Sequence, residues 1–285
     1  MYQASPYYPE KNNIRQAFVN ISESYDWNYS DTVSTLIPKM NLGKDTINFD
    51  LTQKDQILKK INIKADDRIF IYNFSSDSIY TFEVDETPII ACINIYSLGS
   101  QNIEEYDYEI GFNLKQNYKT KGENLVVIGK SNPFQTSSSK PIIWEKISVH
   151  NDTIELEKEN KKWFLNGTYL KDQFYTFEFE KYSLLLRDFN KLDSTNRLRY
   201  LIVWDKSAKK SIFKNIYRDS EGTSLSPIQS VGQQNLQNVE QWIGQIFKDK
   251  PSIIFGFLYY SFGCSEIQFL DRERTSVTIL CDNRH

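Results

Sequence analysis

The chain has 285 residues, with 34 Lys and Arg against 37 Asp and Glu, for a formal net charge of −3. A dedicated nucleic-acid binder usually carries a clear basic excess, so this balance argues against a nucleic-acid partner. The length predicts one large or two small domains at about 100–200 residues each, and no apolar stretch approaches the ~20 residues that a membrane-spanning helix needs.

The composition favours strands. Aromatic residues make up 14% of the chain, with 18 Tyr and 18 Phe against 11 Gly and 8 Pro. Aromatic and β-branched side chains suit the half-buried, pleated surface of a sheet. Because the expected strands follow one another through hairpins rather than helical crossovers, antiparallel pairing should dominate. We therefore predict a β-rich α+β fold with mostly antiparallel sheets, sandwich or barrel-like, and about three short helices.

Two of these helices are expected near the N-terminus. Residues 1–12 resemble a flexible arm, and apolar residues at spacings of four and three predict a short helix over residues 10–24. A second helix is predicted over residues 52–62, with Asp50 or Thr52 as its N-cap.

Strands dominate from residue 68 onward. Residues 68–74 and 79–84 alternate on either side of a Ser/Asp turn, which predicts a hairpin. Further strands are expected at residues 46–50, 88–96, 106–114 and 125–129. The Ser-rich stretch 131–140 is the most loop-like part of the chain. We place there the boundary between two β-rich subdomains, residues 13–130 and 140–285.

The second subdomain continues the same pattern. Residues 199–205 and 211–217 flank a Lys-rich turn and predict another hairpin. The third helix, over about residues 235–248, carries its apolar residues on one face and is ended by Pro251. Further strands are expected at residues 141–150, 153–157, 163–165, 174–182, 252–262, 264–270 and 275–281.

Few residues offer recognisable catalytic or metal chemistry. The chain has two His, His150 and His285, and three Cys that form no Cys-x-x-Cys pair. Zinc sites and His-dependent nucleophiles therefore find little support. We predict no catalytic residue, no metal site and no cofactor.

Two of the cysteines are candidates for a disulfide. Cys264 and Cys281 lie symmetrically about residues 272–273. A tight hairpin centred there would place the two side chains opposite each other, within reach of a disulfide. The apolar pattern favours a register shifted by one residue, in which Phe269 faces Val277 and Cys264 moves to the other face. A Cys264–Cys281 disulfide and two buried thiols therefore both remain open.

Charge is unevenly distributed along the chain. Residues 66–109 hold ten acidic residues and one basic residue, for a net −9, whereas residues 191–218 hold eight basic and two acidic residues, for a net +6. Segregated charge of this kind steers oppositely charged partners. We predict an acidic face for a basic protein partner. Its candidate residues are Asp66, Asp67, Glu83, Asp85, Glu86, Glu104, Glu105, Asp107 and Glu109.

The leading functional hypothesis is a non-enzymatic binding protein, for which a neutralising, immunity-type protein is one concrete form. The alternative is an exported cell-envelope protein that binds glycan or other surface ligands. A third hypothesis is a hydrolase that uses a carboxylate pair. The candidate pairs are Asp66 and Asp67, Glu104 and Glu105, and Asp107 and Glu109. We expect a cytoplasmic location if the chain is full length, and a periplasmic or cell-surface location if it is a processed form.

Overall fold

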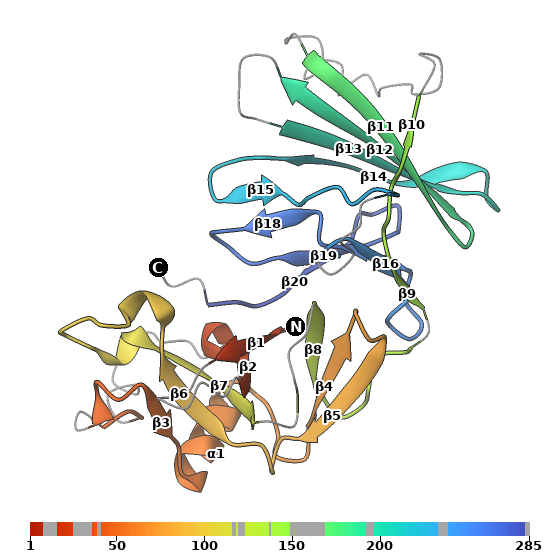
Figure 1. Cartoon of the computed structure of the whole chain (residues 1–285). Helices are drawn as coiled ribbons and strands as arrows, with labels where there is room; N and C mark the ends of the chain where they lie inside the picture. Colours follow the sequence, from red (N-terminus) through yellow and green to blue (C-terminus); the bar gives the residue numbers. More distant parts are fainter. Residues whose placement is uncertain are drawn as a thin grey trace. The chain divides into compact units, whose positions relative to one another are not determined.

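The structure is a computed structural model in two compact units (Figure 1). The described residues are 1–7, 16–24, 36–38, 41–115, 118, 123–136, 138–148, 169–191, 197–232 and 239–282. Unit 1 comprises Met1–Ser138 and Thr278–His285, and unit 2 comprises Ser139–Val277. The chain therefore leaves unit 1 once and returns to it once.

Unit 1 contains two antiparallel sheets. The five-stranded sheet has the order β1-β2-β7-β6-β3, and the three-stranded sheet has the order β5-β4-β8. The strands are β1 (Ala4–Tyr7), β2 (Gln16–Asn20), β3 (Thr46–Asn48), β4 (Arg68–Asn73), β5 (Ser78–Glu83), β6 (Ile89–Ile93), β7 (Tyr108–Lys115) and β8 (Asn124–Gly129). A backbone bridge between Tyr2 and Val126 links the two sheets.

The single α-helix among the described residues, α1 (Leu51–Lys60), begins where its cap predicts. The Asp50 carboxylate accepts a hydrogen bond from the Gln53 N–H at 2.9 Å, and the Gln53 side chain accepts one from the Asp50 N–H at 3.0 Å. This reciprocal capping satisfies two backbone donors that the helix cannot satisfy itself. Ile57 and Leu58 then pack into the core that the helix shares with both sheets.

Unit 2 contains three sheets. Four long strands lie side by side in the sheet β10-β11-β12-β13-β14 (Figure 1), a second sheet has the order β20-β19-β17-β16-β9, and β15 pairs with β18. The strands are β9 (Ser139–Pro141), β10 (Glu145–Ile147), β11 (Tyr169–Phe179), β12 (Tyr182–Lys191), β13 (Arg197–Asp205), β14 (Lys210–Arg218), β15 (Thr223–Leu225), β16 (Trp242–Gly244), β17 (Ile253–Phe255), β18 (Leu258–Tyr260), β19 (Glu266–Phe269) and β20 (Ser276–Thr278).

The β-rich, mostly antiparallel class is confirmed, but the number of helices is not. Where the sequence pattern predicts a helix over residues 10–24, the described part contains β2 and a 3₁₀ turn, Ser22–Ser24. β2 pairs with β1 on one side and with β7 on the other, so tertiary pairing overrides the helical spacing.

The helix predicted over residues 235–248 is also wrong in its described part. Residues 242–244 form β16, which pairs with both β9 and β17. Gln241, Trp242 and Ile243 are consecutive and buried, as in a strand covered on both faces. Residues 233–238 lie outside the described residues.

Both ends of the chain differ from the sequence expectation. Residues 4–7, assigned to a flexible arm, form β1 and pair with β2. The C-terminal segment from Thr278 groups with unit 1, where the Leu280 N–H donates to the Met1 carbonyl oxygen at 2.7 Å. No helix in the described ranges is long and apolar enough to cross a membrane.

Candidate functional site

The nine predicted acidic residues divide into two groups. Asp66, Asp67, Glu83, Asp85 and Glu86 lie where β4 begins and β5 ends, and the Val84 N–H donates to the Asp67 carbonyl oxygen at 3.1 Å. Glu104, Glu105, Asp107 and Glu109 lie at the start of β7.

The register of β6 and β7 separates these groups. Ile89, which follows the first group, pairs with Phe112, whereas Ile93 at the other end of β6 pairs with Tyr108. A strand of this length spans about 13 Å at ~3.3 Å per residue. The two acidic groups therefore lie at opposite ends of the β6–β7 pair.

Basic side chains pair with three carboxylates of the first group, those of Asp66, Asp67 and Glu83. Lys130 pairs with Asp66, and its Nζ lies 3.5 Å from a carboxylate oxygen of Asp67. The hydrogen bond from Lys130 lowers the pKa of Asp66 below its usual value. Arg68 Nε lies 2.9 Å from Glu83 Oε1. These carboxylates already have cationic partners within the unit.

A buried lysine holds the turn that carries the rest of the first group. Lys54 Nζ donates to the carbonyl oxygens of Val84, Asp85 and Thr87 at 2.7, 2.6 and 3.0 Å. Burial lowers the pKa of Lys54 below its usual value. The turn is fixed from inside, while the Asp85 and Glu86 side chains are exposed.

The second group lies in and directly after the segment that connects β6 to β7, and hydrogen bonds hold this connection in shape. Two 3₁₀ turns, η3 (Ile95–Ser97) and η4 (Glu105–Asp107), lie between β6 and β7. Asn94 caps the first turn by accepting from the Tyr96 N–H at 2.9 Å, and its amide donates to Glu109 at 2.8 Å.

Asp107 joins the two halves of this connection. Its carboxylate accepts from Ser97 Oγ at 2.6 Å and from the Glu104 N–H at 2.8 Å. Its carbonyl oxygen accepts from the Asn94 N–H at 2.8 Å. Asp107 and Glu109 are therefore used to hold the connection in shape, and Glu104 is left exposed on its surface.

This connection displays apolar side chains to solvent. Ile95 is 73% exposed, Tyr96 76%, Leu98 56% and Tyr106 37%. Scattered apolar residues are ordinary on a surface, but several of them on one braced connection make it a candidate interaction surface. We name these four residues together with Glu104 and Glu105 the β6–β7 patch.

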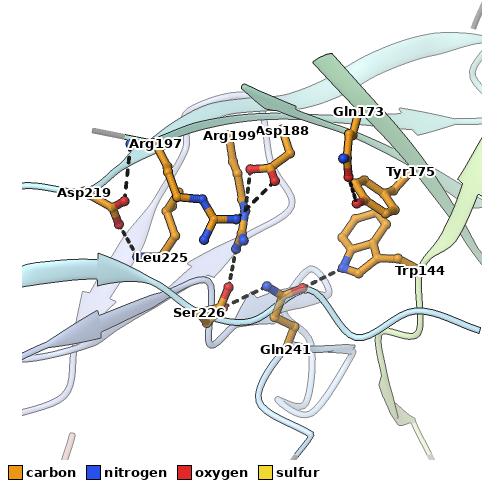
Figure 2. Close-up of polar contacts among 10 residues, drawn as sticks. All are labelled: Trp144, Gln173, Tyr175, Asp188, Arg197, Arg199, Asp219, Leu225, Ser226 and Gln241. Atoms are coloured by element: carbon orange, nitrogen blue, oxygen red, sulfur yellow. Dashed lines mark hydrogen bonds and ion pairs between the residues drawn. The ribbon is translucent and has the colours of Figure 1, made fainter. Parts of the chain in front are cut away.

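Two arginines of the basic segment 191–218 pair with an acidic residue inside unit 2 (Figure 2). Arg199 is 1% exposed, and its Nε donates to Asp188 at 3.1 Å. Its Nη1 donates to the Ser226 carbonyl oxygen. Arg197 lies 3.3 Å from the second oxygen of Asp188. Burial lowers the pKa of Arg199, and Asp188 counteracts that effect.

The same network continues to a buried tryptophan (Figure 2). Gln241 donates to Ser226 Oγ at 2.8 Å and accepts from Trp144 Nε1 at 2.6 Å. Trp144 is fully buried in the core of unit 2. This network supports the fold of the unit.

The cysteines differ in state. Cys92 is the free cysteine of the described part, and burial raises the pKa of its thiol. Cys264 and Cys281 are both disulfide-bonded. The Phe269 N–H donates to the Thr275 carbonyl oxygen at 2.8 Å, which belongs to neither register considered from the sequence.

We expect the chain purified without reductant and then unfolded in denaturant to titrate one thiol, that of the buried Cys92, against three after reduction. Closing a loop of about 15 residues stabilises by about 3 kcal/mol, so a Cys264→Ser/Cys281→Ser variant should unfold at lower temperature. Thiol titration and thermal scans with and without reductant test this. Reductant should not affect the double variant further, and three thiols in the unreduced chain would contradict the bridge.

Metal binding and carboxylate or histidine catalysis gain no support from the described residues. No group of three or more His, Cys, Asp or Glu in that part of the chain is placed to hold a metal ion. His150 and His285 lie outside the described residues. Asp66 and Glu104, which belong to two of the three candidate carboxylate pairs, are exposed.

No protein-family model, no curated protein and no solved structure matches the chain.

Sequence patterns missed the apolar part of the β6–β7 patch. Residues 88–96 were expected to form one strand, whereas β6 ends at Ile93. Ile95 and Tyr96 were thus assigned to a mostly apolar strand. The available signal was Asn94, a residue that favours caps and turns, followed by Gly99 and Ser100.

Proposed function

We propose that the protein is a non-enzymatic binding protein whose β6–β7 patch docks a basic protein partner. The observation that supports this proposal is the exposure of Ile95, Tyr96 and Leu98 on a connection braced by Asp107. A braced loop loses little conformational freedom on binding, which favours affinity.

The patch resembles a protein-binding surface in its composition. Interfaces combine an apolar and aromatic centre with a polar rim, and Tyr is enriched among the residues that dominate binding. In the proposed interface Tyr96 provides the exposed aromatic ring, and Glu104 and the half-buried Glu105 provide the charged rim. An acidic rim attracts a positively charged surface and speeds association.

A neutralising, immunity-type protein is the concrete form of this proposal. Such a protein would cover a functional surface of its partner rather than transform a substrate. The hydrolase hypothesis lacks comparable support, because Asp66 is paired with Lys130 and Glu104 is exposed.

The test begins with affinity capture from an extract of the native host, with the intact chain as bait. Each captured basic protein is then purified and titrated against four chains: wild type, Tyr96→Ala, Glu104→Lys/Glu105→Lys, and Asp85→Lys/Glu86→Lys. The last variant makes the same charge change at the other end of β6.

We expect Tyr96→Ala to weaken binding about 30-fold, the effect of losing a dominant interface residue. Charge reversal at Glu104 and Glu105 should slow association and reduce its salt dependence. The Asp85→Lys/Glu86→Lys control should stay within about threefold of wild type. Equal loss in the control, or the absence of any basic protein bound by the wild type, would contradict the proposal.

One observation favours the exported cell-envelope alternative. Both Cys264 and Cys281 are disulfide-bonded, and disulfides persist mainly in oxidising compartments. Thiol content of the protein taken directly from its host, with thiols blocked at lysis, tests this location. A fully reduced chain would remove the argument.

A further inference from the structure

Strand β5 is the outer strand of the three-stranded sheet β5-β4-β8 in unit 1 (Figure 1). It pairs with β4 along its whole length of six residues, without a register shift. No strand in the described part of the chain pairs with its other side. An edge strand presents unpaired N–H and C=O groups to which another strand can bond, so proteins usually protect such edges.

The other edge strands among the described residues are protected in familiar ways. Six of them, β3, β9, β10, β15, β18 and β20, have three residues each. β1 contains Pro6, β14 carries three basic residues and a register shift against β13, and β8 is bridged by Tyr2. β5, with the sequence Ser-Ile-Tyr-Thr-Phe-Glu, has neither Pro, nor Lys, nor a bulge. It is therefore the edge that is left open to pairing.

The hydrogen bonds at the end of β5 show which of its backbone groups point outward. The Val84 N–H donates to the Asp67 carbonyl oxygen at 3.1 Å, which continues the ladder between β5 and β4. Hydrogen bonding alternates along an antiparallel strand. The even-numbered residues of β5 therefore bond to β4, and the odd-numbered residues, Ile79, Thr81 and Glu83, direct their backbone groups away from it.

The open part of this edge is short and well defined. The Thr87 N–H donates to the Glu83 carbonyl oxygen at 3.1 Å, so that acceptor is already used. The N–H and C=O groups of Ile79 and Thr81 have no such partner among the described residues. Each copy of the chain thus presents two donors and two acceptors in a row.

We propose that β5 pairs with β5 of a second copy of this chain, antiparallel and about a two-fold axis, so that two three-stranded sheets join into one of six strands. A two-fold axis perpendicular to the sheet keeps each face on its own side, so each residue must pair with one of the same parity. The register that places Ile79 opposite Thr81 of the second copy meets this condition. It also uses all the open groups of both copies, in four hydrogen bonds.

The same register brings compatible side chains together. Tyr80 lies on the axis opposite Tyr80 of the second copy, and aromatic pairs across strands are favourable. Tyr80 is 37% exposed, and its ring contacts that of Tyr118 with the centroids 4.8 Å apart. At the end of the register Glu83 faces Asp77 of the second copy, and Arg68 Nε, 2.9 Å from Glu83 Oε1, compensates this pair of carboxylates. The inference does not rest on the β6–β7 patch.

The first test is sedimentation equilibrium of the full chain from about 1 μM to about 1 mM. An interface of one strand pair is small, so we expect the dimer to form in the upper part of this range. Amide hydrogen exchange gives a residue-level measurement of the same event. Exchange at Ile79 and Thr81 should slow as the concentration rises, whereas exchange at Tyr80, which bonds to β4 in the monomer, should not change.

Substitutions at Thr81 test the pairing. Thr81→Pro removes one outward N–H from each copy and no bond to β4, and should weaken association about 30-fold. Thr81→Lys retains every backbone group, places like charges across the axis and should weaken association to a similar degree. Thr81→Val, the matched control, should stay within about threefold of the wild type. A mixture of Thr81→Lys and Thr81→Glu chains should associate again.

Cysteine cross-linking tests the register. Residue 80 of each copy lies on the axis at a non-hydrogen-bonded pair, where side chains approach most closely, so Tyr80→Cys should form an intermolecular disulfide under mild oxidation. The two copies of residue 78 lie four residues apart along the strands, about 13 Å, so Ser78→Cys should stay uncross-linked. Circular dichroism at about 1 μM, where the wild type is expected to be monomeric, checks that each variant is folded. If Thr81→Pro is not folded, Thr81→Lys decides.

Four results would overturn the proposal. The first is a wild-type chain that remains monomeric up to about 1 mM. The second is association that Thr81→Lys leaves unchanged. The third is equal cross-linking of Ser78→Cys and Tyr80→Cys. The fourth is protection of the Ile79 and Thr81 amides that does not depend on concentration, which would assign the edge to a partner within the same chain.

Discussion

Replacement of Asp188 by Ala is expected to destabilise unit 2 by about 3–5 kcal/mol, because it leaves a buried guanidinium without its counter-charge. Arg199 is 1% exposed, and its Nε donates to the carboxylate that the variant removes. The Ser226 carbonyl oxygen is then the acceptor that remains for the Arg199 guanidinium. Hydrogen exchange at Leu186 and Leu201 in the core of unit 2 measures the loss, with Ile71 as the reference in unit 1.

Two further variants show whether charge or packing causes this effect. In an Asp188→Leu/Arg199→Leu variant both charges are absent, and most of the lost stability should return, since apolar replacement of a whole buried pair is often neutral. Lys206→Ala/Glu178→Ala removes a pair whose side chains are 47% and 55% exposed, and should cost less than about 1 kcal/mol. A double Leu variant as unstable as Asp188→Ala would contradict the explanation.

Replacement of Gly256 by Ala is expected to cost more than about 4 kcal/mol, because the backbone conformation and the surrounding space both exclude a side chain. Gly256 has a φ of +84°, and a Cβ built there would lie 1.7 Å from the Glu240 carbonyl oxygen. The turn that contains Gly256 joins β17 to β18. Thermal unfolding and exchange at Ile243 and Ile254 measure the loss.

Gly263 provides the matched control, since it has the same φ of +84° and no atom within 4 Å of its built Cβ. Gly263→Ala should therefore cost only the conformational strain, about 1–2 kcal/mol. Equal costs at the two positions would show that the close approach to Glu240 contributes nothing.

Local signals in the sequence predict local structure well in this protein. The helix α1 follows from Asp50 and an apolar stripe, because a capping box involves residues only three apart. The hairpin of β4 and β5 follows from alternation on both sides of a polar turn. Both features depend on neighbours in the chain.

Features that depend on distant residues were not predictable. Strand β12 was not expected, because Leu185 interrupts the alternation of Leu184 and Leu186 and the polar residue Asp188 follows. The carboxylate of Asp188 is buried against Arg199, which a sequence pattern assigns to the surface.

The candidate site likewise combines features that local sequence predicts with features that depend on distant residues. The charge distribution along the chain predicts an acidic face. Pairing of Asp66 with Lys130, 64 positions later in the chain, helps decide which of its carboxylates remain available to a partner. Exposure of Ile95 and Tyr96 could not be read from a pattern in which apolar residues are assigned to the core.

The hydrogen bond between Leu280 and Met1 has a consequence for synthesis on the ribosome. Met1 is translated before unit 2, whereas Leu280 is translated after it. Translation of the 139 residues of unit 2 alone takes roughly 7–28 s at about 5–20 residues per second. A nascent chain stalled within unit 2 therefore holds a unit 1 that lacks its last segment.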